Sequence, residues 1–247
     1  MKITLKSLFA GAMLLAASAQ VHAAAVLYFE SGPSPDSATV ALGNLGYTVT
    51  QVSSNTAFAT QVATGAYDLV VIDLPHGGTD ATSDTALATY INAGGRAIHF
   101  QWDPSAAIQA AFQVAVASTF SAPLDVFAWV SGDPVFNVPN SVLGLNVVQD
   151  GSGTNGQRVD PVGTAVALAG YTGAPAAGQA AMVLGNDGRT IFNAFSTEDM
   201  NTTQMVALYE NQIISVLGGA ASVPVPAPLL LIAAGLFFAA SRKRKLG

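Results

Sequence analysis

The first half of the chain alternates short apolar runs with segments of helical periodicity. Its apolar runs are typical of strands that are buried on both faces of a sheet, and its helical segments end at glycines such as Gly46. This order predicts an α/β protein with a flavodoxin-like mixed, mostly parallel sheet flanked by helices. Strands are predicted over residues 25–30, 48–53, 67–75 and 96–102, and helices over 37–47 and 84–95.

The second half of the chain is predicted to be rich in strands. Short apolar segments are separated there by Gly, Pro and Asn, and "NDG" at 186–188 is typical of a hairpin turn. A final amphipathic helix begins at Asn201 or Thr202 and ends at Gly218. Strands are predicted over residues 125–131, 144–150, 164–172, 179–185 and 190–196. We therefore expect one globular domain over residues 24–220.

The N-terminal segment has the pattern of a secretory signal peptide. Lys2 and Lys6 precede an apolar run at 8–19, and small residues at Val21 and Ala23 follow it. The alternative is a membrane anchor, but the run is shorter than the roughly 17 to 25 residues that a spanning helix needs. We expect residues 1–23 to be a signal peptide that signal peptidase removes after Ala23, so that the protein is exported.

The charges of the domain exclude some partners. Residues 24–220 hold all 15 acidic side chains against three arginines, Arg96, Arg158 and Arg189, which gives a net charge of −12. Such a surface repels phosphate backbones, so we expect no nucleic-acid partner. The chain has no cysteine, which excludes disulfides and a lipoprotein anchor.

Two stretches resemble the class I glutamine amidotransferase-like fold, including its ThuA-like branch. They are "GAYDLVVIDLPHGG" at 65–78 and "LATYINAGGRAIHF" at 87–100, and the resemblance extends over about residues 25–215. It implies that a catalytic member would carry a nucleophilic cysteine on the turn after a central strand. The matching stretch here reads "HFQWD" at 99–103, with no thiol, so no catalytic residue is assigned.

Other nucleophile and cofactor motifs are also missing. No G-x-S-x-G string occurs, and Ser105 is best interpreted as a helix N-terminal cap or a turn residue. "GSGTNG" at 151–156 matches a dinucleotide-binding spacing, but Pro161 and Gly163 disfavour the helix that such a site needs. Pro161 also stands where a calcium loop requires its twelfth-position acid. We expect a flexible surface loop there, and neither a cofactor nor a metal.

Two histidines and three acids form a candidate ligand cluster. His76 and His99 lie near the carboxyl ends of predicted parallel strands, where α/β sheets bind ligands. With Asp73, Asp103 and Glu198 they could bind a metal or move a proton. The simpler interpretation makes His99 a hydrogen-bonded core residue and His76 a loop residue. We favour it because no H-E-x-x-H or comparable ligand spacing occurs.

The C-terminal segment, residues 221–247, has three parts in a fixed order. A proline motif at 223–227 precedes an apolar run at 229–240, and a basic tip follows at 242–245. The motif consists of Val223, Pro224, Val225, Pro226 and Ala227, and the tip of Arg242, Lys243, Arg244 and Lys245. A short transmembrane segment over 228–240 is predicted, with the basic tip in the cytoplasm. The order indicates a sorting signal, and a simple tail anchor is the alternative.

This tail resembles the PEP-CTERM class of bacterial sorting signals, in its apolar VPLPA-type variant, because Val225 replaces the usual glutamate. The resemblance implies a Gram-negative protein that an exosortase processes after a transient stay in the inner membrane. It also implies a final place at the cell surface or outside the cell, associated with exopolysaccharide or biofilm.

Two classes of function remain open for the domain. We favour a non-catalytic structural or binding component of that matrix, because no recognisable nucleophile, cofactor loop or metal spacing occurs. The alternative is a degenerate amidotransferase-like or ThuA-like hydrolase that acts on a small extracellular or glycan substrate.

Overall fold

The computed structural model describes the central domain with four internal gaps. Its described residues are 24–30, 37–74, 78–101, 103–149 and 156–218. The expected signal peptide, His76 and the C-terminal sorting segment lie outside these ranges. Among the described helices none is long and apolar enough to cross a membrane. The transmembrane segment expected at 228–240 lies outside the described residues and stays a prediction.

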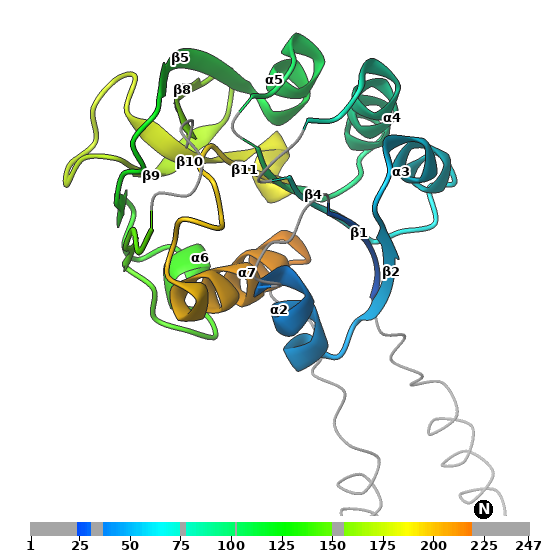
Figure 1. Ribbon diagram of the computed structural model, residues 1–247, viewed down its shortest axis with the longest axis horizontal. Coiled ribbons are helices and arrows are strands. Elements are labelled where there is room, and N and C mark those ends of the chain that lie inside the picture. The colour runs from blue at the N-terminus through cyan, green and yellow to red at the C-terminus, as the bar shows by residue number, and fades with distance from the viewer. Residues whose placement is uncertain (1–23, 31–36, 75–77, 102, 150–155, 219–247) are drawn as a thin grey trace, which may run out of the picture. The chain divides into compact units, whose positions relative to one another are not determined.

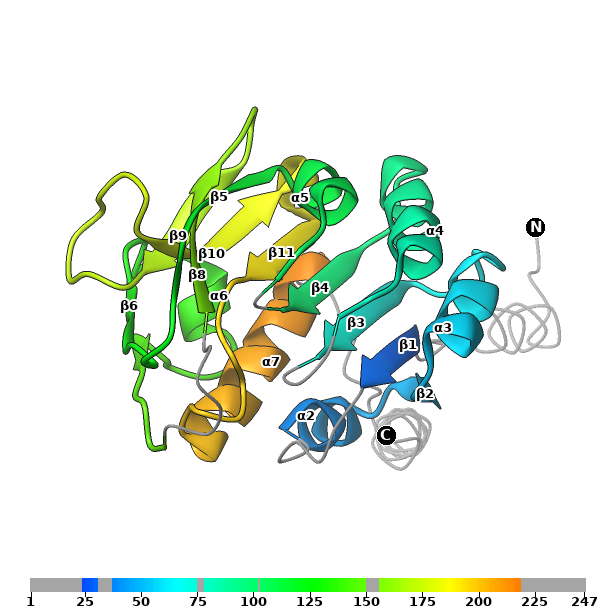
Figure 2. The same cartoon turned by 45° about the horizontal axis from the view of Figure 1, so that its top comes forward.

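A parallel half-sheet forms the centre of the domain. Its neighbouring strands run in the same direction, as Figure 2 shows for β1, β3, β4 and β11. In spatial order the strands are β2 (Thr48–Val52), β1 (Ala25–Glu30), β3 (Leu69–Asp73), β4 (Ala97–Phe100) and β11 (Thr190–Asn193). The first four are the strands predicted from the first half of the chain.

The sheet continues beyond β11 with antiparallel strands from the second half of the chain. They are, in order, β10 (Ala180–Gly185), β9 (Val166–Gly170), β6 (Val126–Ala128) and β7 (Gly144–Leu145). The predicted fold class is therefore confirmed: a mixed α/β sheet flanked by helices, with a β-rich second half.

Two strands were not predicted from the sequence. β5 (Val114–Phe120) pairs antiparallel with β8 (Gly156–Pro161), and β8 touches β10 where Val159 faces Ala180. Much of β5 is exposed and half of β8 is polar, so neither stretch has the apolar pattern of a buried strand. β8 begins at Gly156, the last glycine of the "GSGTNG" string, so a strand occupies the position where a dinucleotide site needs a helix.

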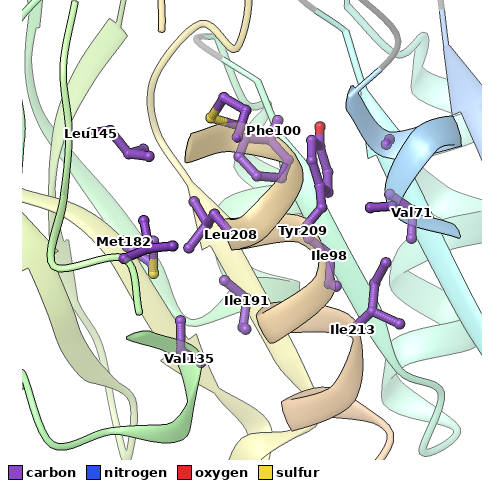
Figure 3. Packing of buried hydrophobic residues seen from close by; sticks show 14 of the residues in the cluster. Val71, Ile98, Phe100, Val135, Leu145, Met182, Ile191, Leu208, Tyr209 and Ile213 are labelled. Atoms are coloured by element: carbon purple, nitrogen blue, oxygen red, sulfur yellow. The ribbon is translucent and has the colours of Figure 1, made fainter. Parts of the chain in front are cut away.

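Helices cover both faces of the sheet, as Figure 1 shows. One face carries α2 (Ser37–Leu45), α6 (Pro134–Asn137) and α7 (Thr202–Val216), and the other carries α3 (Asn55–Val62), α4 (Ala81–Asn92) and α5 (Ala106–Phe112). Successive strand residues alternate between two hydrophobic cores, because side chains along a strand point to opposite faces. Figure 3 shows the core under α7, where Phe100 and Tyr209 lie side by side with ring centroids 4.7 Å apart.

Helix caps and turns follow the sequence signals. Ser105 caps α5, where its Oγ accepts the Ile108 N–H at 3.3 Å, so the cap interpretation is confirmed. Asn201 caps α7 in the same way. The "NDG" segment joins β10 to the antiparallel β11 with positive φ angles at all three residues, which confirms the predicted turn.

Candidate functional site

The carboxyl ends of β1 and β3 bring two acidic side chains next to each other. Glu30 and Asp73 are register partners at the last positions of these parallel strands. Both lie on the face covered by α2 and α7, because Tyr28 and Val71, two residues earlier, belong to the core on that face. Glu30 also accepts a hydrogen bond from Gln51 Nε2 at 3.0 Å. This edge of an open α/β sheet is where ligands usually bind.

Asp73 is buried and accepts hydrogen bonds on both carboxylate oxygens. Thr197 Oγ1 donates to Oδ1 at 2.9 Å, and the Tyr209 hydroxyl donates to Oδ2 at 2.6 Å. The pKa of Tyr209 is raised well above its ordinary value, chiefly by burial and then by the negative charge of Asp73. Tyr209 therefore stays protonated and remains a donor. The three side chains connect β3 to α7 and to the segment after β11.

The segment after β11 is unusually polar for its burial. Ser196, Thr197, Glu198 and Asp199 are each at most 8% exposed. Its backbone is tied to residues 147–149: Val148 N–H donates to the Asp199 carbonyl, and Gln149 Nε2 donates to the Glu198 carbonyl, both at 2.8 Å. Because Thr197 contacts Asp73, Glu198 belongs to the same region of the domain as Asp73.

His99 lies on the other side of the sheet from Asp73. In the β3–β4 register Asp73 faces Phe100, whereas His99 faces Ile72, so the two side chains point to opposite faces. The imidazole packs between Phe112 and Phe192, with ring centroids 5.3 and 5.6 Å away. The structure therefore does not bring Asp73 and His99 together, because the sheet separates them.

His99 is a core residue, but the hydrogen bond expected for it is absent. Neither ring nitrogen has a partner within the described part of the chain. Complete burial lowers the pKa of the imidazole to about 3, because the charged form would lose its hydration. At neutral pH the ring is therefore uncharged and shielded from solvent, and it cannot exchange protons with a substrate.

The turn after β4 carries a buried amide instead of a nucleophile. Gln101 is 3% exposed, and its Nε2 donates to the backbone carbonyl of Asp103 at 3.1 Å. The Asp103 side chain itself is exposed to solvent. Of the five candidate cluster residues, His76 is not described, and no three described acidic or histidine side chains are arranged to hold a metal ion.

Sequence reasoning missed three residues of this region: Glu30, Thr197 and Tyr209. Glu30 had a usable signal, because "AVLYFE" and "LVVID" both end a buried run with an acid. The sequence pattern predicts Tyr209 only as an apolar position of an amphipathic helix, and it predicts Thr197 only as a loop residue. Their contacts with Asp73 join residues more than 120 positions apart, which no local pattern reveals.

Comparison with known proteins identifies the fold. No family model matches the sequence, and no curated protein is significantly similar to it. A glutamine amido transferase from Methylobacillus flagellatus matches 78% of this chain and 95% of its own, with 8% identity and a TM-score of 0.52. A glutamine amidotransferase from Thermotoga maritima matches 80% of this chain and 99% of its own, with 10% identity and a TM-score of 0.51. At these identities the likeness shows the fold alone, which resembles that of these glutamine amidotransferases.

Proposed function

We propose that this protein is an exported, non-catalytic component of the extracellular matrix that has a structural or binding role linked to exopolysaccharide or biofilm. The main support for a non-catalytic role is the turn after β4. The catalytic branch of the resembling family has a cysteine nucleophile there, whereas this chain has the buried carboxamide of Gln101 and no cysteine at all. A carboxamide that donates to the backbone carbonyl of Asp103 cannot replace a thiolate.

The buried titratable groups give further support. A general acid or base must reach the proton that it transfers. Asp73 is 1% exposed and already accepts a hydrogen bond on each oxygen, and His99 is enclosed by aromatic rings. Neither side chain is therefore placed to transfer a proton to a substrate.

The full chain is expected to show no glutaminase activity. Without a thiol, no thioester can form at the turn after β4. Ammonia release from glutamine should equal the rate in buffer, measured beside an active amidotransferase as the positive control. Hydrolysis above the buffer rate would contradict the non-catalytic assignment.

The two ends of the chain support export and sorting. We propose that signal peptidase cleaves after Ala23 and that the 228–240 segment inserts in the inner membrane while residues 242–245 stay in the cytoplasm. An exosortase-type enzyme would then process the chain near the proline motif at 223–227. Prolines suit this position because they lack an N–H and keep the backbone extended and accessible.

Changing Pro224 and Pro226 to alanine is expected to block processing without preventing insertion. The apolar run at 229–240 is unchanged, so the variant should accumulate unprocessed in the inner membrane. The measurement is fractionation of the native host with mass spectrometry of the mature C-terminus. Deletion of residues 242–245 is the comparison variant, and it should impair orientation instead. Wild-type protein that keeps Lys245 and stays in the inner membrane would show that the tail is an anchor.

One observation favours the alternative of a degenerate hydrolase. Glu30 and Asp73 are neighbouring carboxylates at the edge of the sheet where α/β enzymes bind ligands, and Glu30 is the more exposed of the two. A hydrolytic activity on a glycan or small ester that is lost in Glu30→Gln, with the fold intact, would support this alternative.

A further inference from the structure

A hollow lies in the antiparallel half of the sheet, among residues of β8, β9 and β10 and the segment before β10. Its volume is about 310 Å³, which is at the small end of ligand pockets. Asp160 is the one charged residue of its lining, and the other lining residues are Trp, Pro and Ala. We call it the Trp129 hollow, and its lining includes Trp129, Asp160, Ala167, Pro175, Ala177 and Ala180.

The indole of Trp129 is held in one position. Its Nε1–H donates to the Thr172 carbonyl at 2.8 Å. The ring lies directly against the backbone of Gly170, where a Cβ atom would come within 1.9 Å of Cζ2. Only glycine permits this close approach. The hollow therefore has a rigid aromatic wall that loses little conformational entropy when a ligand binds.

One backbone hydrogen bond orients the carboxylate of Asp160, but no positive side chain neutralises its charge within the described residues. Oδ1 accepts the Gly178 N–H at 2.6 Å, and Asp160 has no ion pair within the described part of the chain. Arg158, two residues earlier on β8, donates to Gln179 Oε1 and lies over the Phe120 ring. The negative charge of Asp160 is therefore available to a cation from outside.

We propose that the Trp129 hollow binds one amino-sugar unit of a cationic polysaccharide. The apolar face of the sugar ring would lie on the indole, and its ammonium group would contact Asp160 and the π face. The volume suits a single ring, and the net charge of −12 with no lysine attracts a polycation. This inference rests on the proposed function, in which the domain binds matrix polysaccharide, and adds its site and ligand class.

The test is calorimetric titration of the full chain with a hexamer of glucosamine and with a hexamer of N-acetylglucosamine. Ala177→Trp fills the hollow from an exposed position, so folding is not at risk, and it should weaken binding of the glucosamine hexamer at least about tenfold. Asp160→Asn should weaken it about fivefold, and less at high salt. Asp187→Asn is the control: it makes the same charge change at an exposed turn and should leave the affinity unchanged.

The outcomes separate this inference from the proposed function. Binding that neither Ala177→Trp nor Asp160→Asn weakens would overturn the hollow as the site and leave a polysaccharide-binding role intact. Equal affinity for the acetylated hexamer would overturn the cationic ligand class. Absence of binding to both hexamers would overturn the inference. The proposed function would then be tested separately, by measuring whether the protein co-sediments with the isolated exopolysaccharide of the host.

Discussion

Replacing Asp73 with alanine is expected to lower the free energy of unfolding by about 3 kcal/mol. The change leaves the hydroxyls of Tyr209 and Thr197 buried without their acceptor, and each such group costs about 1 to 3 kcal/mol. Burial, the largest cause of the raised pKa of Tyr209, remains in the variant, so the hydroxyl stays protonated there. The effect is measured by urea unfolding followed by circular dichroism.

Two comparison variants make the Asp73 result specific. Asp73→Asn keeps the size but offers one acceptor oxygen and one amide donor, so its loss of stability should be smaller than that of alanine. Asp103→Ala removes an exposed carboxylate of the candidate cluster and should change the free energy of unfolding by less than about 0.5 kcal/mol. If Asp73→Ala were as stable as Asp103→Ala, Asp73 would not be a structural link between β3 and α7.

Acid is expected to destabilise the domain through His99. The pKa of this imidazole is about 3 in the folded state against an ordinary value of 6.5, so the unfolded chain takes up the proton first. The stability is therefore complete above pH 6.5 and is lost as the pH falls from 6.5 toward 3. The slope approaches 1.36 kcal/mol per pH unit below pH 6.5, so the loss between pH 6.5 and pH 5 is about 1.7 kcal/mol. Unfolding curves at several pH values measure it.

The variant His99→Phe measures how much His99 contributes to the loss of stability in acid. A phenyl ring keeps an aromatic group beside Phe112 and Phe192, cannot take up a proton, and removes two nitrogens that have no described partner. The variant should be at least as stable as the wild type at pH 7 and should lose less stability between pH 6.5 and pH 5, above the range where most carboxylates titrate. Identical pH slopes for the two proteins would show that His99 is not the group responsible.

Much of the fold could be predicted from the sequence because its signals are local. The segments 25–29 and 69–72 are apolar without interruption, which is typical of a strand that is buried on both faces. Ser105, Asn201 and the "NDG" turn act through hydrogen bonds and backbone angles within a few residues. β5 and β8 were missed because their partners lie far away along the chain and their exposed faces are not apolar.

The candidate site was predicted less well, because it depends on which face each side chain occupies. Asp73 and His99 both lie near the ends of neighbouring strands, so the sequence alone suggests that they are close. The register places Asp73 opposite Phe100 and His99 opposite Ile72, and this one-residue offset puts the sheet between them. Register is a property of the packed sheet, so it could not be obtained from either strand by itself.

What the sequence by itself determined is covalent or local: the absence of cysteine, a domain with three arginines and no lysine, the proline motif and basic tip at the C-terminus, and the order of strands and helices. Only the tertiary structure decided that Asp73 binds Tyr209 and Thr197, that His99 is enclosed by aromatic rings, and that Trp129 and Asp160 line one hollow. Composition and periodicity describe residues that are near one another in the sequence, whereas these contacts join residues from distant segments. Those segments meet because both faces of the sheet must be buried at once.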